Sequence, residues 1–300
     1  MASPIRSVRW GQPWLAFELC STNASLLARA RTIFRPWQDQ VPVTTTYRWH
    51  IEQEGTRENG ESKYWKVRDD SNLNISRASS ERALTTVEFL AVHKLYYFHD
   101  SPLIVHGAVV VRDGKGVLIL GPNQAGKSTL ACALWQQGWS LMCDDTTSID
   151  VQFSTANSTP RRVSLRHSSR AFLGEKLWSC ISTTPSSSQS DEGFLFHPNE
   201  IDKKPRPRDT KLSAVIFLAR RGNSIIGATL KRLEPANALL ALLPYCNFVQ
   251  RLDFINKGKY QAELGRVIRL IGPFVESVPA YDLGKGNLSE MMKAVEKTIS

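Results

Sequence analysis

The residues Gly121-Pro-Asn-Gln-Ala-Gly-Lys-Ser-Thr129 are the most informative part of this sequence, because they match the pattern G-x-x-x-x-G-K-[ST] of a P-loop. The apolar run Gly116–Leu120 before them predicts a strand, and residues 127–137 predict a helix. An earlier apolar run, Ile104–Val111, is joined to the first by a segment with an Asp-Gly turn signal, which predicts a β-hairpin. The predicted order of hairpin, loop and helix supplies the strand and helix context that a P-loop requires.

Each residue type in this loop has a physical reason to be there. Glycines allow successive backbone N–H groups to turn inward around phosphates, and the helix N-terminus adds its partial positive charge. Lys127 can reach the β- and γ-phosphates, and the Ser128 hydroxyl can ligate Mg²⁺. The alternative is a chance glycine turn. The nucleotide-binding residues that the motif predicts are Gly121, Pro122, Asn123, Gln124, Ala125, Gly126, Lys127, Ser128 and Thr129.

An acidic pair, Asp144-Asp145, follows the next predicted strand, Trp139–Cys143, and begins 17 residues after Lys127 (144 − 127). If this strand is a parallel neighbour of the strand before the loop, the loop and the acids lie at the same carboxyl edge of the sheet, where α/β proteins bind ligands. One carboxylate can then hold a metal ion, and the other can accept a proton from an attacking hydroxyl. A capped turn is the alternative interpretation, since Asp is common after strands.

Three blocks of this region resemble the HPr kinase/phosphorylase catalytic domain and its bacterial relatives. They are Val105-His106-Gly107, the P-loop, and Gly138-Trp-Ser-Leu-Met-Cys-Asp-Asp145. In that family a histidine precedes the P-loop by one hairpin, and an Asp pair follows the next strand. Residues 212–243, a strand and then a leucine-rich helix, are also similar, so the resemblance spans roughly residues 90–283.

The resemblance implies an α/β fold with a P-loop nucleotide-binding core similar to that of HPr kinase and phosphoenolpyruvate carboxykinase. It also implies ATP and Mg²⁺ as cofactors and phosphorylation of a hydroxyl group. Carried over by position, Lys127, Asp144 and His106 would be catalytic, with Asp144 as the general base. Asp145 and Ser128 would bind the metal ion. The roles of the two aspartates could be exchanged, and His106 could instead be an ordinary histidine at a strand end.

One segment departs from the family pattern. Relatives carry a glutamate and a glycine-rich signature after the Asp pair, which contribute a further metal ligand. Here residues 160–170 hold no carboxylate, and the next one is Glu175. The arginines of the segment could instead bind a nucleotide or a phosphorylated product, or form a solvated basic loop. The N-terminal residues do not resemble those of the true HPr enzymes, so HPr itself is not expected as the substrate.

The rest of the chain predicts two domains, a small N-terminal α+β module of mainly β character over residues 1–80 and an HPr kinase-like P-loop domain over residues 81–300. Residues 8–54 are typical of short strands with turns, and Ser79 or Ser80 is expected to cap a helix that runs through His99. Residues 152–211 are rich in Ser, Thr, Pro and Arg, and two polar stretches within them, residues 179–190 and 202–210, are expected to be mobile loops and not core. Further expected elements are a strand at 212–218, helices at 235–243, 260–271 and 288–299, and a strand near 278–283.

Composition narrows the class of protein. With 42% hydrophobic and 22% charged residues among 300, the chain is typical of a soluble globular protein and is not a collagen, a coiled coil or a disordered chain. No apolar run approaches the ~18–20 residues of a membrane helix, and no secretory signal occurs, so we expect a cytoplasmic protein without membrane insertion. The five scattered cysteines suggest neither disulfides nor a zinc site.

Charge and motifs together leave three functions open. The net charge of +10 by itself is compatible with nucleic acid, nucleotide phosphates or an acidic peptide, but the motifs favour a nucleotide and we do not expect nucleic acid. The favoured function is an ATP-dependent kinase acting on a Ser or Thr of a peptide or protein, or on a small metabolite. Because some relatives modify precursor peptides, such a peptide is among the acceptors considered.

The alternatives are a nucleotide-binding regulatory protein without transfer activity and an ATPase subunit. The loop alone looks like that of an ABC transporter ATPase, although no Leu-Ser-Gly-Gly-Gln-like signature follows it. Assembly as a homo-oligomer stays open.

Overall fold

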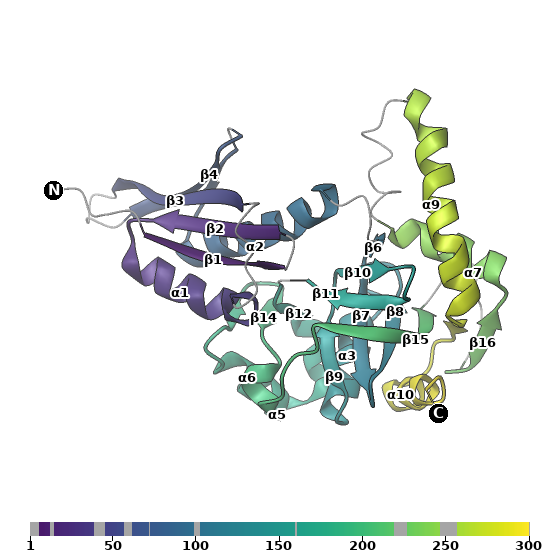
Figure 1. Ribbon diagram of the computed structural model, residues 1–300. Coiled ribbons are helices and arrows are strands. Elements are labelled where there is room, and N and C mark those ends of the chain that lie inside the picture. The colour runs from purple at the N-terminus through teal and green to yellow at the C-terminus, as the bar shows by residue number, and fades with distance from the viewer. Residues whose placement is uncertain are drawn as a thin grey trace. The chain divides into compact units, whose positions relative to one another are not determined.

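The computed structural model describes residues 6–12, 15–38, 46–56, 62–71, 73–98, 103–159, 161–218, 227–246 and 257–299 (Figure 1). By its contacts the chain divides into unit 1, residues 1–98 with 160–162, and unit 2, residues 99–159 with 163–300. The long helix that begins at Ser80 therefore belongs to unit 1, whereas the boundary expected from the sequence lay before this helix.

Unit 1 is one five-stranded sheet with two helices. The sheet order is β1-β2-β3-β4-β5, and only the β2–β3 pair is parallel. Its core is aromatic, with the rings of Trp10 and Phe34 stacked at 3.9 Å between centroids. The elements are β1 (Arg6–Gln12), β2 (Leu15–Ser21), α1 (Ala24–Phe34), η1 (Arg35–Trp37), β3 (Thr46–Thr56), β4 (Ser62–Asp69), β5 (Asn74–Arg77) and α2 (Ser80–Phe98).

Helix α1 corrects the interpretation of residues 8–54 as strands and turns alone. The Asn23 side chain accepts a hydrogen bond from the Leu26 backbone N–H at 2.9 Å and so caps the helix. Leu27, Ala30 and Phe34 then follow at helical spacing, and all three are buried. The helix is the crossover that the parallel β2–β3 pair requires.

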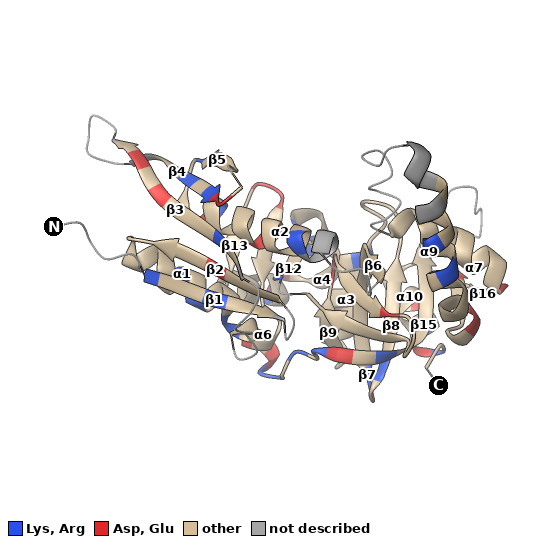
Figure 2. Ribbon diagram, turned by 45° about the horizontal axis from the view of Figure 1, so that its top comes forward, with Lys and Arg blue, Asp and Glu red and all other residues tan. Residues whose placement is uncertain are grey.

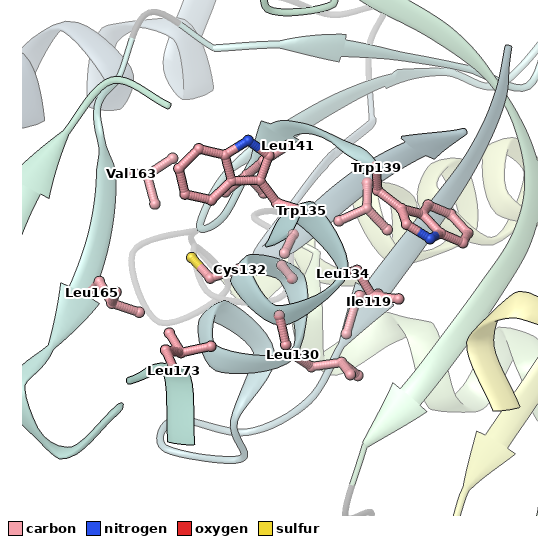
Figure 3. Packing of buried hydrophobic residues seen from close by; sticks show 14 of the residues in the cluster. Ile119, Leu130, Cys132, Leu134, Trp135, Trp139, Leu141, Val163, Leu165 and Leu173 are labelled. Carbon is pink, nitrogen blue, oxygen red and sulfur yellow. The ribbon is translucent and has the colours of Figure 1, made fainter. Parts of the chain in front are cut away.

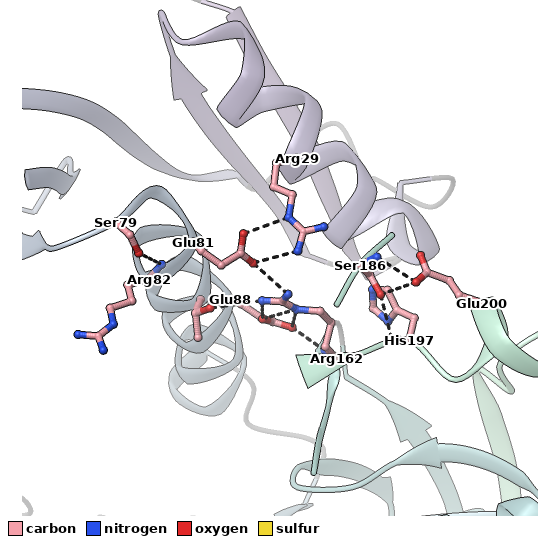
Figure 4. Close-up of polar contacts among 10 residues, drawn as sticks. Arg29, Ser79, Glu81, Arg82, Glu88, Arg162, Ser186, His197 and Glu200 are labelled. Carbon is pink, nitrogen blue, oxygen red and sulfur yellow. Dashed lines mark hydrogen bonds and ion pairs between the residues drawn. The ribbon is translucent and has the colours of Figure 1, made fainter. Parts of the chain in front are cut away.

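Helix α2 begins where the sequence predicted. The Ser79 hydroxyl accepts the Arg82 backbone N–H at 3.2 Å, which makes Ser79 the N-cap. The predicted final residue, His99, lies outside the described residues. Two carboxylates of α2, Glu81 and Glu88, surround the fully buried Arg162 (Figure 4).

Unit 2 is built around a nine-stranded mixed sheet. The order is β6-β10-β11-β15-β8-β7-β9, with β17 paired to β15 and β16. The β8–β15 and β15–β17 pairs are parallel, and the other pairs are antiparallel. The strands are β6 (Leu103–Val105), β7 (Gly107–Arg112), β8 (Lys115–Leu120), β9 (Ser140–Cys143), β10 (Thr147–Asp150), β11 (Thr155–Ser158), β15 (Asp209–Leu218), β16 (Leu230–Leu233) and β17 (Ala280–Leu283).

Helices cover both faces of this sheet, which explains why its central strands are apolar throughout. Ile119 on one face packs with Leu130 and Leu134 of α3 (Lys127–Gln136), as Figure 3 shows. On the other face, Leu118 lies in a cluster with residues of α7 (Pro235–Leu242) and α9 (Lys257–Ser277). Helix α10 (Leu288–Glu296) packs on the α3 side, and η3 (Leu243–Tyr245) follows α7.

The predicted hairpin and helix around the loop are confirmed, but the run 104–111 that was predicted as one strand is interrupted at His106, and its first residues belong to the separate strand β6. Strands β7 and β8 pair antiparallel with Arg112 opposite Lys115, so the turn has two residues. Those residues, Asp113 and Gly114, have φ of 52° and 74°, as a type I′ hairpin turn requires. Gly138, with φ 91°, directly follows the C-cap of α3 and ends it.

The expectation of a loop that stays out of the core is wrong for residues 179–190, which include the end of α5 and β13, whereas residues 203–208 between α6 and β15 hold no helix or strand. The wider segment 152–211 includes β11 and the start of β15, and between them a three-stranded sheet and short helices. Ile181 and Phe196 are fully buried in the cluster under α3. The elements are β12 (Val163–Arg166), η2 (His167–Ser169), α4 (Arg170–Leu173), α5 (Glu175–Ser182), β13 (Ser188–Gln189), β14 (Gly193–Phe196) and α6 (Asn199–Asp202).

Polar contacts explain how so serine-rich a segment becomes ordered. One carboxylate oxygen of Glu200 accepts both the backbone N–H of Ser186 at 3.0 Å and its hydroxyl at 2.6 Å. The backbone N–H of His197 donates to the same hydroxyl at 3.0 Å (Figure 4). Ser186 is fully buried, so these hydrogen bonds take the place of the bonds to water that its polar groups would form at the surface.

The other predicted elements of unit 2 match α7, α10, β15 and β17 to within three residues at each end. Helix α9 is longer than the predicted 260–271, because it continues through Pro273 to Ser277. Among the described residues, no helix is long and apolar enough to cross a membrane.

Candidate functional site

The loop between β8 and α3 closes around the side chain of Lys127. Its Nζ atom donates hydrogen bonds to the carbonyl oxygens of Gly121 at 2.8 Å and Pro122 at 3.1 Å. The backbone N–H of Ala125 donates to the same Pro122 carbonyl at 3.1 Å. The loop therefore places an ammonium group at the carboxyl end of β8 and the N-terminus of α3.

Two glycines of the loop are required for different reasons. A Cβ on Gly121 would lie 3.0 Å from the Leu218 carbonyl oxygen, so a side chain there would require the end of β15 to shift slightly. Gly126 has φ 94°, which favours glycine, and a Cβ there would meet no atom within 4 Å. Gln124 is also left-handed, with φ 65°. Left-handed residues alternating with others occur in the backbone nests that bind anions.

Lys127 is buried, with 8% of its surface exposed. Burial lowers the pKa of its ammonium group, and the negative charge of Asp144 opposes that effect. The lysine therefore carries a charge that burial disfavours and that the negative charge of Asp144 stabilises.

The remaining predicted nucleotide-binding residues differ in their surroundings. Ser128 is half-buried in the first turn of α3. The Thr129 hydroxyl lies 2.8 Å from the hydroxyl of Ser169, which ties α3 to η2. Pro122, Asn123 and Gln124 form the exposed tip of the loop.

The acids lie at the predicted edge, but not on a strand beside β8. Strand β7 lies between β8 and β9, which corrects the expectation of parallel neighbours. Because β7 is antiparallel to both, β8 and β9 still run in the same direction. The loop that starts at Gly121 and the pair Asp144-Asp145 therefore leave the sheet at the same edge.

Asp144 is buried, at 4% exposure, and it is not a solvent-facing turn residue. Its Oδ2 atom accepts the backbone N–H of Ser164 at 2.8 Å. This bond joins the carboxylate to β12, a strand of the three-stranded sheet. The side chain is thus fixed in the interior of unit 2.

His106 and Asp145 form a direct pair. The His106 Nδ1 atom lies 3.1 Å from the Asp145 Oδ1 atom, and both side chains are about one-quarter exposed. The backbone N–H of His106 donates to the Tyr245 carbonyl at 2.8 Å, and that of Gly107 donates to the Asp145 carbonyl at 3.0 Å. The histidine is therefore held at the same edge as the acidic pair.

Three of the arginines in residues 160–170 form ion pairs with carboxylates of the chain. Arg162 is enclosed by Glu88 and Glu81 in unit 1. In unit 2, Arg166 lies 3.8 Å from Glu192, and the Arg170 Nε atom donates to Glu175 at 2.7 Å.

Sequence reasoning did not identify Arg206 as a neighbour of the acidic pair. The Arg206 Nε atom donates to the carbonyl oxygen of Met142 at 2.5 Å, two residues before Asp144. Its charge also lowers the pKa of the Cys143 thiol, although burial outweighs it and raises that pKa to about 11. The basic run around Arg206 suggested only a polar loop, so no signal in the sequence assigned it to this edge.

Carboxylates for a metal ion are few. Within the described part of the chain, no group of three or more His, Cys, Asp and Glu side chains is arranged to hold a metal. Glu175, the first carboxylate after residue 160, is exposed on α5 and paired with Arg170.

The geometry defines unit 2 as a mixed α/β unit whose glycine-rich loop, buried lysine and acidic pair share one sheet edge. The model of a family described as SynChlorMet cassette protein ScmC matches residues 73–158, which hold the hairpin, the loop and the acidic pair. No curated protein matches.

Among solved structures, the chain is similar to the Hpr(Ser) kinase/phosphatase from Coxiella burnetii. The identity is 14%, the match covers 65% of this chain and 94% of that chain, and the TM-score is 0.37. These values describe a distant structural similarity.

Proposed function

We propose that the chain is an ATP-dependent kinase that transfers the γ-phosphate of ATP to a hydroxyl group of a peptide, a protein or a small metabolite. The observation that carries the proposal is the buried Lys127 ammonium group, held on the carbonyls of the 121–126 loop and within electrostatic reach of Asp144. A charge that burial disfavours is stabilised by an anion, and phosphate is the anion that such a loop at a helix N-terminus suits.

The residues of the loop fit the phosphates of a nucleotide, which makes it a P-loop in this proposal. Open space beside Gly126 leaves room where a Cβ would otherwise stand. The N-terminal turn of α3 has backbone N–H groups without partners in the helix. In such a loop Gly121–Thr129 would hold the phosphates, with Lys127 leaving its two carbonyl partners to contact them.

The residues also fit a magnesium ion that is bound mainly through the nucleotide. Mg²⁺ in kinases keeps water ligands and takes only one or two protein carboxylates, so a cluster of three acids is not required. The Ser128 hydroxyl and the Asp145 carboxylate would be the protein ligands. When bound, Mg-ATP supplies the phosphoryl group and neutralises much of its charge.

Asp144 would act as the general base. It would accept the proton of the acceptor hydroxyl while that oxygen forms its bond to the γ-phosphorus. The bond from the γ-phosphorus to the bridging oxygen breaks, and ADP leaves with its electrons. The Ser164 N–H donates to the Oδ2 atom of Asp144 and so fixes the orientation of the carboxylate that would take the proton.

His106 would position Asp145 by the contact between Nδ1 and Oδ1. With Nδ1 facing the carboxylate, the Nε2 atom is directed away from Asp145. A histidine that orients a carboxylate in this way acts through that carboxylate, and not on the transferred group itself.

A regulatory protein that binds a nucleotide without transfer is the second candidate. It is favoured by one observation, that Glu175 is paired with Arg170 at the surface of α5 and does not join the acidic pair. The two candidates agree on the nucleotide and differ on the acceptor.

The test uses the full chain with Mg-ATP. Titration calorimetry measures binding, and ADP release together with transfer of labelled γ-phosphate is followed with a library of Ser- and Thr-containing peptides and a panel of hydroxyl metabolites. A kinase shows acceptor-dependent label transfer that EDTA abolishes. Binding without transfer to any acceptor supports the regulatory protein, and absence of nucleotide binding would sink both.

A further inference from the structure

A concave site lies in unit 2, away from the 121–126 loop. It has a volume of about 650 Å³, in the range of roughly 300–1,000 Å³ that small-molecule and peptide-side-chain pockets span. Its walls are the turn between β10 and β11, the start of β15 and the last turns of α9. Lys211 in this wall is opposite Lys115 at the start of β8, whereas Phe217 is opposite Leu120 at the loop end. At ~3.3 Å per residue the two sites are separated by about 15–20 Å along the strands.

The turn that forms one wall is fixed by its own hydrogen bonds. The Asp150 carboxylate accepts the backbone N–H groups of Gln152 at 3.0 Å and Phe153 at 3.3 Å. Ser154 has φ 51°, its carbonyl accepts the Leu212 N–H at 2.8 Å, and its hydroxyl lies 2.9 Å from that of Ser277. The turn is therefore tied to both β15 and α9.

This fixed turn presents Phe153 to solvent. Its side chain is among the most exposed of the large apolar residues, at 63%. Leu270 and Pro273 of α9 line the same pocket. Burying an exposed aromatic ring is favourable, and a turn that is already rigid loses little entropy when a partner covers the ring.

Two cations complete the pocket. Lys211 and Arg269 line it, and no acidic residue is among the described residues that do so. Neither cation forms an ion pair with any residue in the described ranges of the chain, whereas the nearby Asp150 carboxylate is occupied by the turn. Figure 2 shows basic segments on α9, the helix that carries Arg269.

We propose that this pocket binds an acidic peptide segment, with one apolar side chain of the segment packed on Phe153 and its carboxylates on Lys211 and Arg269. The guanidinium group pairs with a carboxylate in a bidentate manner, and the apolar wall selects for an aliphatic or aromatic neighbour. Nucleic acid fits less well, because its affinity grows with the number of phosphate contacts and this pocket offers two cations beside an apolar wall. The proposal does not depend on phosphoryl transfer.

The test measures fluorescence anisotropy of a fluorescein-labelled octapeptide of alternating glutamate and leucine, titrated with the full chain. Its glutamine–leucine analogue and a labelled oligothymidylate are titrated in parallel. The acidic peptide is expected to bind most tightly. Lys211→Glu with Arg269→Glu is expected to weaken its binding at least tenfold, and Phe153→Ser several-fold. Lys176→Glu, which reverses one charge at an exposed lysine of α5 where the pocket variant reverses two, is the control and should alter binding less than twofold.

Four binding results would overturn the proposal. They are absence of binding by the acidic peptide, equal binding of the glutamine analogue, tighter binding of the oligothymidylate that the same substitutions remove, and equal loss of binding in Lys176→Glu. Sedimentation velocity is run on wild type and Phe153→Ser. If wild type self-associates and Phe153→Ser does not, the surface binds a second copy of the chain, and this result would also overturn the proposal of an acidic peptide. Because all the substituted side chains are exposed, circular dichroism is expected to show unchanged folding.

Discussion

The Nδ1 atom of His106 lies 3.1 Å from the Oδ1 atom of Asp145. These residues are 39 positions apart in the chain (145 − 106). His106 lies between β6 and β7, and Asp145 comes two residues after the end of β9, which pairs with β7. In the proposed kinase, His106 orients the Asp145 carboxylate, which would hold the metal ion.

This relationship predicts coupling between His106 and Asp145. His106→Ala and Asp145→Ala should each lower the rate of phosphate transfer, and the double variant should be little worse than the more damaging single one. Residues in contact usually couple by about 0.5–3 kcal/mol. The measurement is a double-mutant cycle on kcat with a Mg²⁺ titration of each variant. Strictly additive effects would show that the pair does not act as a unit, and an unchanged Mg²⁺ dependence in His106→Ala would remove its positioning role.

Replacing Lys127 is expected to weaken nucleotide binding. Lys127→Ala removes the ammonium group that would face the β- and γ-phosphates and leaves β8 and α3 in place. Calorimetry should show ATP affinity reduced at least about tenfold, which corresponds to ~1.4 kcal/mol. Lys176→Ala at the surface of α5 is the control and should bind as wild type. Equal affinity of Lys127→Ala and wild type would exclude the proposed role of the loop.

The lowered pKa of Lys127 also predicts a pH dependence of stability without nucleotide. A lysine whose pKa is lower in the folded chain than the ordinary 10.5 binds its proton less tightly when folded, so the unfolded state holds more protons in that pH window. The free energy of unfolding of wild type, relative to Lys127→Met, should therefore rise as the pH increases toward 10.5. Below that window the difference is constant. Urea denaturation at pH 8 to 10.5 measures this difference, with Lys176→Met as a surface control. A difference that falls as the pH rises would contradict the prediction.

The buried network of unit 1 predicts a large effect of a single amide substitution. Arg162 is fully buried and donates to both carboxylate oxygens of Glu88. Glu88→Gln leaves this cation without its full counter-charge and should destabilise the fold by about 3–5 kcal/mol. Replacing both residues by apolar ones, as in Arg162→Met with Glu88→Leu, should recover much of that loss. The control is Glu175→Gln, whose exposed pair with Arg170 should matter little, and a small effect in Glu88→Gln would contradict the expectation.

Local patterns in the sequence predicted the hairpin, the loop, α3 and β9, because each is set by a strong short-range signal. The Asp113-Gly114 turn fixes the hairpin, and Gly138 ends α3. The position of β9 could not be predicted, since only pairing across the sheet shows that β7 separates it from β8. Helix α1 had a readable signal in Asn23 and the apolar spacing after it, but strand-like neighbours on both sides favoured the wrong interpretation.

The prediction for the serine-rich segment that begins near Ser179 was wrong for a different reason. Its composition suggests too little apolar surface for a core, yet Phe196 and Ile181 supply anchors, and Glu200 satisfies the polar groups of Ser186. That arrangement depends on residues that meet only after folding. In the site, the ion pairs of residues 160–170 and the contact of Arg206 with β9 are long-range in the same sense, so no local pattern could reveal them.

The Glu200 network predicts protease sensitivity. Glu200→Ala removes the carboxylate oxygen that accepts from both Ser186 donors, and a buried donor that loses its acceptor costs about 1–3 kcal/mol. Residues 183–198 should then be cleaved faster than in wild type under limited proteolysis. Glu192→Ala, at an exposed carboxylate of the same segment, is the control and should change the cleavage rate little. If wild type and Glu200→Ala are cleaved equally fast in this segment, the segment is a mobile loop and the network does not order it.

Asp144 and Asp145 carry the most specific prediction of the proposed mechanism. An acceptor hydroxyl is a weak nucleophile, and a carboxylate within hydrogen-bond reach can orient it and take its proton. Asp144→Asn keeps the shape of the side chain and an oxygen for the Ser164 N–H, but it removes the basicity. Nucleotide binding should therefore survive while transfer falls by about 10²–10⁴-fold, the usual contribution of general acid–base catalysis. Asp145→Asn should instead raise the Mg²⁺ concentration that half-maximal activity requires. Both variants are compared for ATP affinity, Mg²⁺ titration and transfer to the acceptor found in the library. If Asp144→Asn transfers phosphate at the wild-type rate, Asp144 is not the base, and a shift of Mg²⁺ dependence in Asp144→Asn alone would exchange the roles of the two aspartates.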